Sequence, residues 1–232
     1  MVSHQPHVGT LREKPLHASL KQWCAQPGDR FEQPVDGYVI DVVSGDLLIE
    51  VQTRGFSSMK KKLATLLDLG HRVRIVHPIA AGKWIVKVDH DGTEISRRKS
   101  PKRGDATDVF SELVSFPDLI ENPNLDLLVV MTAEEEIRRH DPTKAWRRKG
   151  WVVEERRLIE IIDTLILNGA ADLVGLLPPG MPEEWTTADL ARELGRPRRI
   201  AQQMAYCLRA CGAASSIGKQ GNAVVHRTVD CP

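Results

Sequence analysis

The sequence has 232 residues, of which 41% are hydrophobic and 27% charged, and its formal net charge is +1 at pH 7. This composition is typical of a globular protein with a hydrophobic core and excludes a largely disordered chain. No apolar run approaches the length of a membrane-spanning helix, so no membrane partner is expected. The first residues lack the apolar stretch of a secretory signal, and the four cysteines lack a metal-binding spacing, which predicts a cytoplasmic protein with reduced thiols.

Residues 1–140 alternate helix-like and strand-like segments and predict an α/β domain. Apolar residues three to four positions apart indicate the helices, whereas β-branched runs and apolar–polar alternation indicate the strands. Ser44-Gly45 is the predicted turn of a hairpin, and residues 96–104 are a predicted basic loop. The expected elements in chain order are a helix at 14–24, strands at 30–35, 38–43 and 47–53, a helix at 57–69, strands at 72–77 and 83–88, a helix at 107–113 and a strand at 125–131.

The rest of the chain predicts a basic linker at 141–153 and a second, smaller domain at 154–232. Leu158, Ile161, Ile162 and Leu165 have the spacing of an apolar helical stripe, so a helix is expected from Glu154 to Leu167. Thr186 and Asp189 form a capping-box pattern at the start of the next helix. The remaining expected elements are helices at 186–194 and 197–210 and a hairpin of strands at 214–217 and 222–228.

Two acids, Asp41 and Glu50, lie in the predicted hairpin. Side chains alternate along a strand, so Asp41 shares a face with Val43, and Glu50 shares a face with Leu48. A two-residue loop at Ser44-Gly45 makes Glu50 the diagonal neighbour of Asp41, and a four-residue loop places the two acids opposite each other. In both registers the two carboxylates converge on one face.

A pair of carboxylates on a mostly apolar hairpin is costly, because like charges repel and burial disfavours ionisation. A divalent cation removes this cost, since carboxylates and water are the ligands that Mg²⁺ prefers. The bound ion can then activate water for phosphodiester hydrolysis. The pair therefore indicates a site for Mg²⁺ or Mn²⁺, and the alternative is that both acids face solvent on the open side of a sheet.

An aspartate on one strand, followed nine residues later by Glu-x-Gln on the next strand, resembles the PD-(D/E)XK, or restriction-endonuclease-like, nuclease superfamily. The predicted order of helix, three strands, helix and strand over residues 14–78 is similar to the core of that superfamily. The resemblance covers residues 1–140 and implies a mixed-sheet nuclease core. It also implies that Asp41 and Glu50 are catalytic and hold Mg²⁺ or Mn²⁺.

Gln52 stands where this superfamily usually has a lysine, so the resemblance implies that Gln52 positions the attacking water without supplying a charge. The following helix can provide the lysine from Lys60, Lys61 or Lys62, and Lys60 is favoured because it lies nearest the helix start. Glu13 is implied as a further metal ligand. Gln52 also leaves open a degenerate nuclease fold that does not cut.

Residues 154–228 resemble a winged helix-turn-helix, because a helix, a turn at Gly195, a basic helix and a hairpin follow one another in order. The resemblance implies DNA binding through arginine and glutamine side chains, and a protein-interaction module is the alternative. Further basic residues cluster in the 96–104 loop and the linker. The expected nucleic-acid contacts are Arg97, Arg98, Lys99, Lys102, Arg103, Arg147, Arg148, Lys149, Arg196, Arg198, Arg199, Gln202 and Lys219.

Together these features predict a metal-dependent DNA endonuclease in which the winged-helix domain docks the DNA. Cutting both strands of a duplex takes two active sites, which favours a homodimer. The alternative is a non-catalytic DNA-binding regulator, or an accessory subunit, built on a degenerate nuclease fold.

Overall fold

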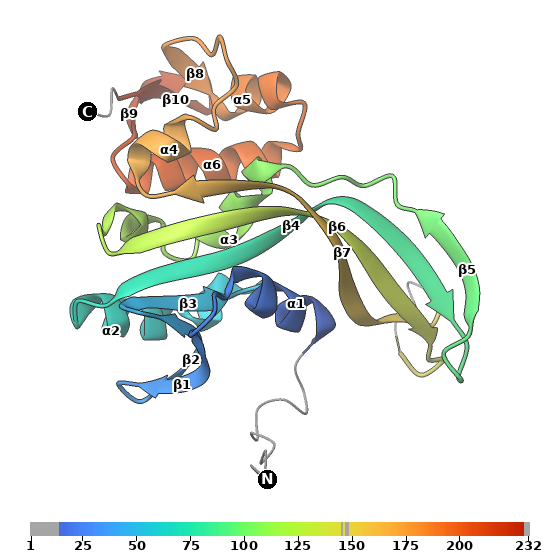
Figure 1. The fold of residues 1–232 in the computed structure, drawn as a ribbon. Coiled ribbons are helices and arrows are strands. Elements are labelled where there is room, and N and C mark those ends of the chain that lie inside the picture. The colour runs from blue at the N-terminus through green and yellow to red at the C-terminus, as the bar shows by residue number, and fades with distance from the viewer. Residues whose placement is uncertain (1–13, 145, 147–148, 230–232) are drawn as a thin grey trace.

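The computed structural model describes residues 14–144, 146 and 149–229, which form a seven-stranded mixed sheet and a smaller C-terminal sheet (Figure 1). The strands of the large sheet are β1 (Arg30–Val35), β2 (Tyr38–Ser44), β3 (Leu47–Val51), β4 (Arg72–Val88), β5 (Glu94–Lys99), β6 (Leu125–His140) and β7 (Trp151–Leu167). Their order is β1-β2-β3-β4-β6-β7, with β5 paired to β4. β3, β4 and β6 run parallel, whereas β1–β2, β2–β3, β4–β5 and β6–β7 are antiparallel pairs.

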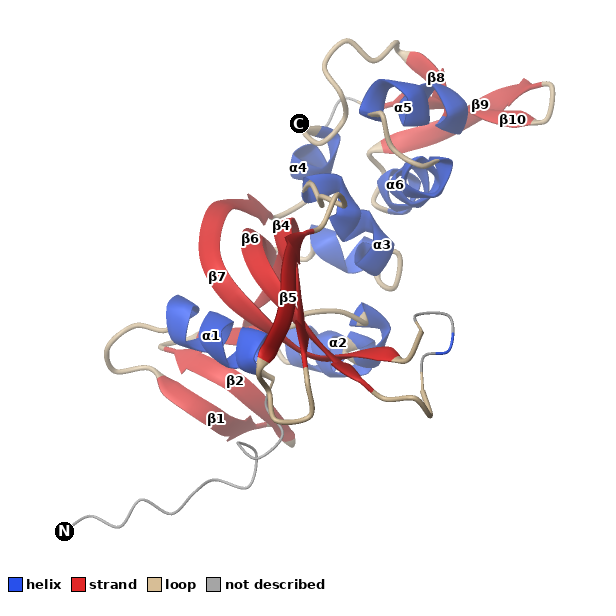
Figure 2. Cartoon of the chain, turned by 90° about the vertical axis from the view of Figure 1, so that its right-hand side faces the viewer, coloured by secondary structure: helices blue, strands red, loops and turns tan. Residues whose placement is uncertain are grey.

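Helices cover both faces of the large sheet (Figure 2). They are α1 (Pro15–Cys24), α2 (Lys60–Asp68) and α3 (Phe110–Leu113), with the 3₁₀ turns η2 (Phe56–Ser58), η3 (Ala106–Val109) and η4 (Pro117–Glu121). Leu16 and Leu20, one helical turn apart, bury α1 on one face, and Leu63 and Leu66 bury α2 in a different core cluster on the other. The expected mixed α/β class is therefore confirmed. No described helix reaches the length and apolar character that a membrane span needs.

The helix predicted over Glu154–Leu167 is wrong, because this segment is strand β7, paired antiparallel with β6. β7 has 17 residues, and the register to β6 leaves Glu154, Ile159 and Ile162 without a partner. Each of the three is therefore the extra residue of a β-bulge, which shifts the alternation of the two faces by one position. As a result, Leu158 and Ile161 pack against the same core cluster although they are three positions apart.

The predicted linker is also wrong, because residues 141–150 join β6 to β7 within one sheet. The Asp141 N–H donates to the Gly150 carbonyl at 2.7 Å and so closes this connection. The large sheet accordingly extends to Leu167, beyond the predicted boundary at residue 140. Arg147 and Arg148 lie outside the described residues. The predicted basic loop is in part strand β5, whose residues are all exposed.

The C-terminal part has the expected order of helix, turn, helix and hairpin. Its elements are α4 (Ala170–Val174), β8 (Glu184–Thr186), α5 (Thr187–Leu194), α6 (Arg198–Ala210), β9 (Ala214–Gln220) and β10 (Ala223–Thr228). The capping box is confirmed, since Thr186 Oγ1 accepts from the Asp189 N–H at 3.3 Å and Asp189 Oδ2 accepts from the Thr186 N–H at 2.9 Å. Gly195 ends α5 in the left-handed conformation that favours glycine.

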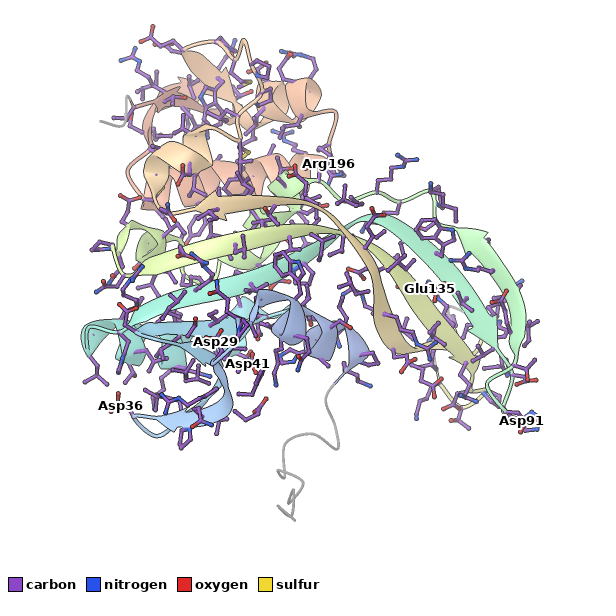
Figure 3. All side chains as sticks on the ribbon, viewed as in Figure 1. Asp29, Asp36, Asp41, Asp91, Glu135 and Arg196 are labelled. Carbon is purple, nitrogen blue, oxygen red and sulfur yellow. The ribbon has the colours of Figure 1, made fainter. Side chains whose placement is uncertain are left out.

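The C-terminal part packs through α6 against α3 and the 3₁₀ turns η3 and η4 of the first part. Met204 and Leu208 of α6 belong to the same buried core as Phe110 of α3. The guanidinium of Arg196, between α5 and α6, pairs with Asp108 and with Asp105, where the Nη1–Oδ2 distance is 3.0 Å (Figure 3). A shared core and an ion-pair cluster therefore hold the two parts together.

Phe110→Ala is expected to lower the free energy of unfolding by about 3–5 kcal/mol, because this fully buried ring leaves a cavity when it is removed. Urea denaturation followed by circular dichroism should show a single transition that moves as a whole, since the core is shared. Tyr206→Ala, at an exposed position of α6, is the control and should shift the transition by less than about 1 kcal/mol. Two separate transitions, of which only one moves, would contradict the shared core.

Candidate acidic site between β2 and β3

β2 and β3 form the predicted hairpin. The register pairs Ser44 with Leu47, so the turn is Gly45-Asp46, one residue later than expected. Continued along the strands, this register places Asp41 opposite Glu50. This opposite placement of the two acids was predicted for a four-residue loop. The observed loop has two residues and reaches the same register because it lies one position later.

The backbone pairing of β2 with β3 ends at Val42 and Ile49, and the two acids lie directly beyond it. The Val51 N–H donates to Asp41 Oδ2 at 2.8 Å, and the Asp41 N–H donates to Glu50 Oε1 at 3.4 Å. The side chains of Asp41 and Glu50 are 16% and 12% exposed. The carboxylates therefore occupy the opening between the strands, where solvent still reaches them. Asp41 is labelled in Figure 3.

Lys62 of α2 supplies a cation to this pair. Its Nζ lies 2.6 Å from Glu50 Oε1 and also donates to the Val39 carbonyl at 2.6 Å. Lys60, the lysine favoured from sequence, is exposed, and so is Lys61. The preference for Lys60 is thus corrected to Lys62, because the rotation of α2 that buries its leucines turns Lys62 toward the strands.

α1 supplies two more basic side chains from the opposite face of the sheet. His17 Nε2 lies 3.2 Å from Asp41 Oδ2. Lys21 is buried, pairs with Glu32, and has its Nζ 4.0 Å from Asp41 Oδ1. Neither His17 nor Lys21 was expected at the site from the sequence. Their spacing of four positions, which puts both on one side of a helix, was the available signal.

Gln52 is not brought to the acidic pair. Its Nε2 donates to the carbonyls of Arg54 at 2.8 Å and Gly55 at 3.2 Å, so its amide holds the loop that leads into α2. The structure gives it no contact with Asp41 or Glu50 among the described residues. Glu13, the predicted additional ligand, lies outside those residues.

The surroundings push the pKa values of the two acids apart. Burial and the negative charge of Asp41 raise the pKa of Glu50, although Lys62 opposes them. Burial also acts to raise the pKa of Asp41, but the hydrogen bond and charge of His17, together with the Val51 N–H, outweigh it and lower that pKa. Asp41 is thus held ionised, whereas Glu50 binds a proton more readily, and such separation is typical of acid–base sites.

Asp41 and Glu50, on neighbouring strands, each offer hard oxygen donors for a metal ion. Within the described residues, the one group of three metal-ligating side chains is Asp89–His90–Asp91, at the turn between β4 and β5. There Asp89 accepts from the N–H groups of Asp91 and Thr93, which explains its position as part of a turn (Figure 3). A pair of carboxylates fits Mg²⁺, because this ion keeps several water ligands.

Most of the predicted nucleic-acid contacts are exposed. Among those that the structure describes, the exception is Arg196, whose ion pairs with Asp105 and Asp108 hold it at the junction between the two parts. Arg97 is exposed but also forms an ion pair within the protein, since its Nη2 lies 2.8 Å from Glu135 Oε1. The outer face of α6 also carries Tyr206 and Arg209, which the sequence analysis did not select. The exposed predicted contacts are Arg97, Arg98, Lys99, Lys102, Arg103, Lys149, Arg198, Arg199, Gln202 and Lys219.

The opposite pKa shifts predict opposite effects of neutral isosteres on stability. Glu50→Gln should raise the free energy of unfolding at pH 7, because it removes a carboxylate that the fold disfavours when ionised. Asp41→Asn should lower it, because the fold favours that ionised carboxylate. The Glu50 difference should shrink as the pH falls toward about 4, where this acid becomes protonated in both the folded and the unfolded chain. The Asp41 difference should persist to about pH 4 and shrink only below it, because the fold lowers the pKa of Asp41. Urea titrations at about pH 7, 4 and 3 measure this, and effects of the same sign at pH 7 would contradict the assignment.

Comparisons with known proteins identify a family. A family model described as a domain of unknown function, DUF8091, matches residues 14–168, which span the large sheet from α1 to the end of β7. An uncharacterized protein of Treponema pallidum (strain Nichols) is 31% identical over 222 residues, which cover 95% of this chain and 87% of that protein. No solved structure matches the chain significantly. The chain therefore belongs to the DUF8091 family.

Proposed function

We propose that this protein is a metal-dependent nuclease that hydrolyses phosphodiester bonds in DNA. The observation that carries the proposal is the meeting of Asp41 and Glu50 in the opening between β2 and β3, with Lys62 on Glu50. Two carboxylates in a partly buried opening need compensating cations, and a lysine beside them is the third part of the nuclease pattern. The lysine comes from α2, in keeping with the expectation that the following helix supplies it.

Each side chain of the site has a role in this proposal. Asp41 and Glu50 hold the ion, which when bound lowers the pKa of a water ligand and offsets the charge of the phosphate. Lys62 orients the water and adds positive charge where the transition state gains negative charge. His17 keeps Asp41 ionised and fixes the orientation of its carboxylate.

The architecture supports the same proposal. The order α1-β1-β2-β3-α2-β4 agrees with the core order of the PD-(D/E)XK resemblance, and both helices lie next to the acids. The order α5, turn, α6 and hairpin agrees with the winged-helix resemblance. Because unrelated functions share a fold, these agreements count for less than the arrangement of the site itself.

The outer face of α6 is the proposed docking surface for DNA. Arg198, Arg199, Gln202, Tyr206 and Arg209 are all exposed there, and the helix contains no acidic residue. Arginine and glutamine can bind phosphates and base edges, and a tyrosine ring adds contact area. A duplex docked on this face would be held by charge over about three turns of α6.

A DNA-binding regulator on a degenerate nuclease fold is the second candidate. Two observations favour it. The side-chain amide of Gln52 donates to the backbone of the loop before α2, and basic side chains of the protein already lie beside both Asp41 and Glu50. A protein that no longer binds metal needs cations of this kind to keep its carboxylates ionised. The two candidates therefore differ in whether the acidic pair binds metal.

Incubation of labelled duplex, single-stranded and branched DNA with the protein and Mg²⁺ or Mn²⁺ tests the first candidate. Asp41→Ala and Glu50→Ala should abolish cleavage while DNA binding persists, because both groups hold the ion. Lys62→Ala should reduce cleavage by about 10²–10³-fold, the usual effect of losing one charge-stabilising group. Lys60→Ala, at an exposed position two residues earlier on α2, is the matched control and should cleave normally.

The result that contradicts the nuclease proposal is tight DNA binding without cleavage by the wild-type protein in either metal. Equal losses of cleavage in Lys60→Ala and Lys62→Ala would overturn only the role proposed for Lys62. Calorimetric titration with Mn²⁺ separates the two candidates further, since binding that disappears in Asp41→Ala is expected only of a metal site.

Arg199→Ala is expected to weaken DNA binding and to lower the slope of log affinity against log salt by about 1, the value for one lost phosphate contact. Its thermal stability should not change, because the side chain is exposed. Arg196→Ala is the contrasting variant and should lower stability, because its ion pairs with Asp105 and Asp108 are lost. An unchanged salt slope in Arg199→Ala would argue against DNA docking on α6.

A further inference from the structure

A polar pocket of about 260 Å³ lies apart from the acidic pair, beside the irregularity of β4 at Ala80–Gly82. Its walls come from Thr53 after β3, from β4 and β7, from the chain between β5 and α3, and from α3 itself. Asp41, Glu50 and Lys62 do not line it. It therefore needs an explanation of its own.

The acids in the pocket wall are already satisfied by protein donors. Asp108 accepts from the Arg196 guanidinium and, at 3.2 Å, from the Asp105 N–H. Glu112 Oε2 accepts from the N–H groups of Gly55 at 2.7 Å and Phe56 at 3.0 Å. Neither acid requires a cation from a ligand.

The cations of the pocket keep unused donors. Lys83 donates to Glu136 Oε2 at 2.9 Å, which uses one of its three N–H bonds. Arg156 binds Glu134 through Nε and Nη2, which leaves Nη1. Lys102 Nζ forms no hydrogen bond or ion pair with any residue that the structure describes. A ligand of this pocket must therefore bring negative charge and several acceptor oxygens.

His77 offers an acceptor for a protonated oxygen of a ligand, and Gly104 lets the pocket wall approach β4 closely. His77 Nδ1 lies 2.7 Å from the Gln52 carbonyl, so it carries the proton and leaves Nε2 as an acceptor. Burial lowers the pKa of His77 and keeps the ring neutral. A Cβ at Gly104 would lie 2.7 Å from Ile79 Cγ2 and 3.0 Å from the Ala80 carbonyl oxygen, so glycine is required where this segment meets β4.

We propose that this pocket binds a phosphomonoester through Lys102, Lys83 and Arg156, with His77 accepting from a protonated phosphate oxygen or a neighbouring hydroxyl. Charge-assisted hydrogen bonds from lysine and arginine suit phosphate oxygens. A phosphate at the end of a nucleic-acid strand and a free mononucleotide share this chemistry. The inference concerns binding alone and does not depend on cleavage at the acidic pair.

The test uses the 232-residue chain in EDTA, so that metal-dependent cleavage plays no part. Binding is measured by fluorescence anisotropy for a single-stranded oligonucleotide with a 5′-phosphate, a 3′-phosphate or neither. Inorganic phosphate and a deoxynucleoside 5′-monophosphate serve as competitors and as ligands in thermal-shift measurements at constant ionic strength. We expect one phosphorylated end to bind at least about tenfold more tightly than the unphosphorylated strand.

Lys102→Ala should remove this preference, because Lys102 has no hydrogen-bond or ion-pair partner among the described residues. Lys61→Ala is the control: it removes an exposed lysine of α2 that does not line the pocket, and the preference should remain. Stabilisation by the mononucleotide or inorganic phosphate without a preference for strand ends would support the pocket and assign it to free phosphates. Absence of all phosphate-dependent binding, or an equal preference in the Lys102→Ala and Lys61→Ala proteins, would overturn the proposal.

Discussion

The repulsion between Asp41 and Glu50 is the constraint on which this part of the structure depends. The two acids lie where the backbone pairing of β2 and β3 ends, and their carboxylates take up amide hydrogens that a longer ladder would have used. Ionised acids in such a position need nearby positive charge. α1 and α2 supply it from opposite faces of the sheet, while their leucines form the core on those same faces. Core packing and charge compensation therefore rest on the same two helices.

The sequence was sufficient to find the acidic pair but not to complete its surroundings. Strand alternation predicted that Asp41 and Glu50 share a face, and their register depended on whether the loop had two or four residues. In the structure a two-residue turn, shifted by one position, places the two acids opposite each other. Three consecutive lysines made the choice between Lys60 and Lys62 depend on the rotation of α2, which the burial of its leucines sets. His17 reaches the site from an element that only the tertiary fold brings near.

Local signals predicted the C-terminal part well, because capping residues and turn glycines act within a few positions of themselves. The prediction of a helix in place of β7 was wrong for the opposite reason, because the deciding signal is not local. Bulges at Ile159 and Ile162 convert the two-residue alternation of a strand into spacings of three, which are also the spacings of a helix. Only the pairing with β6, which the local pattern does not encode, distinguishes a strand from a helix here.

The same bulges have a consequence for the solubility of the folded chain. β7 is an outer strand of the large sheet, and an outer strand with exposed isoleucines can recruit strands from other molecules. Ile159 and Ile162 are 47% and 52% exposed, but each is the extra residue of a bulge, where the backbone departs from regular spacing. An incoming strand loses its hydrogen-bond register at both points, so the irregular edge protects the protein from sheet-to-sheet aggregation.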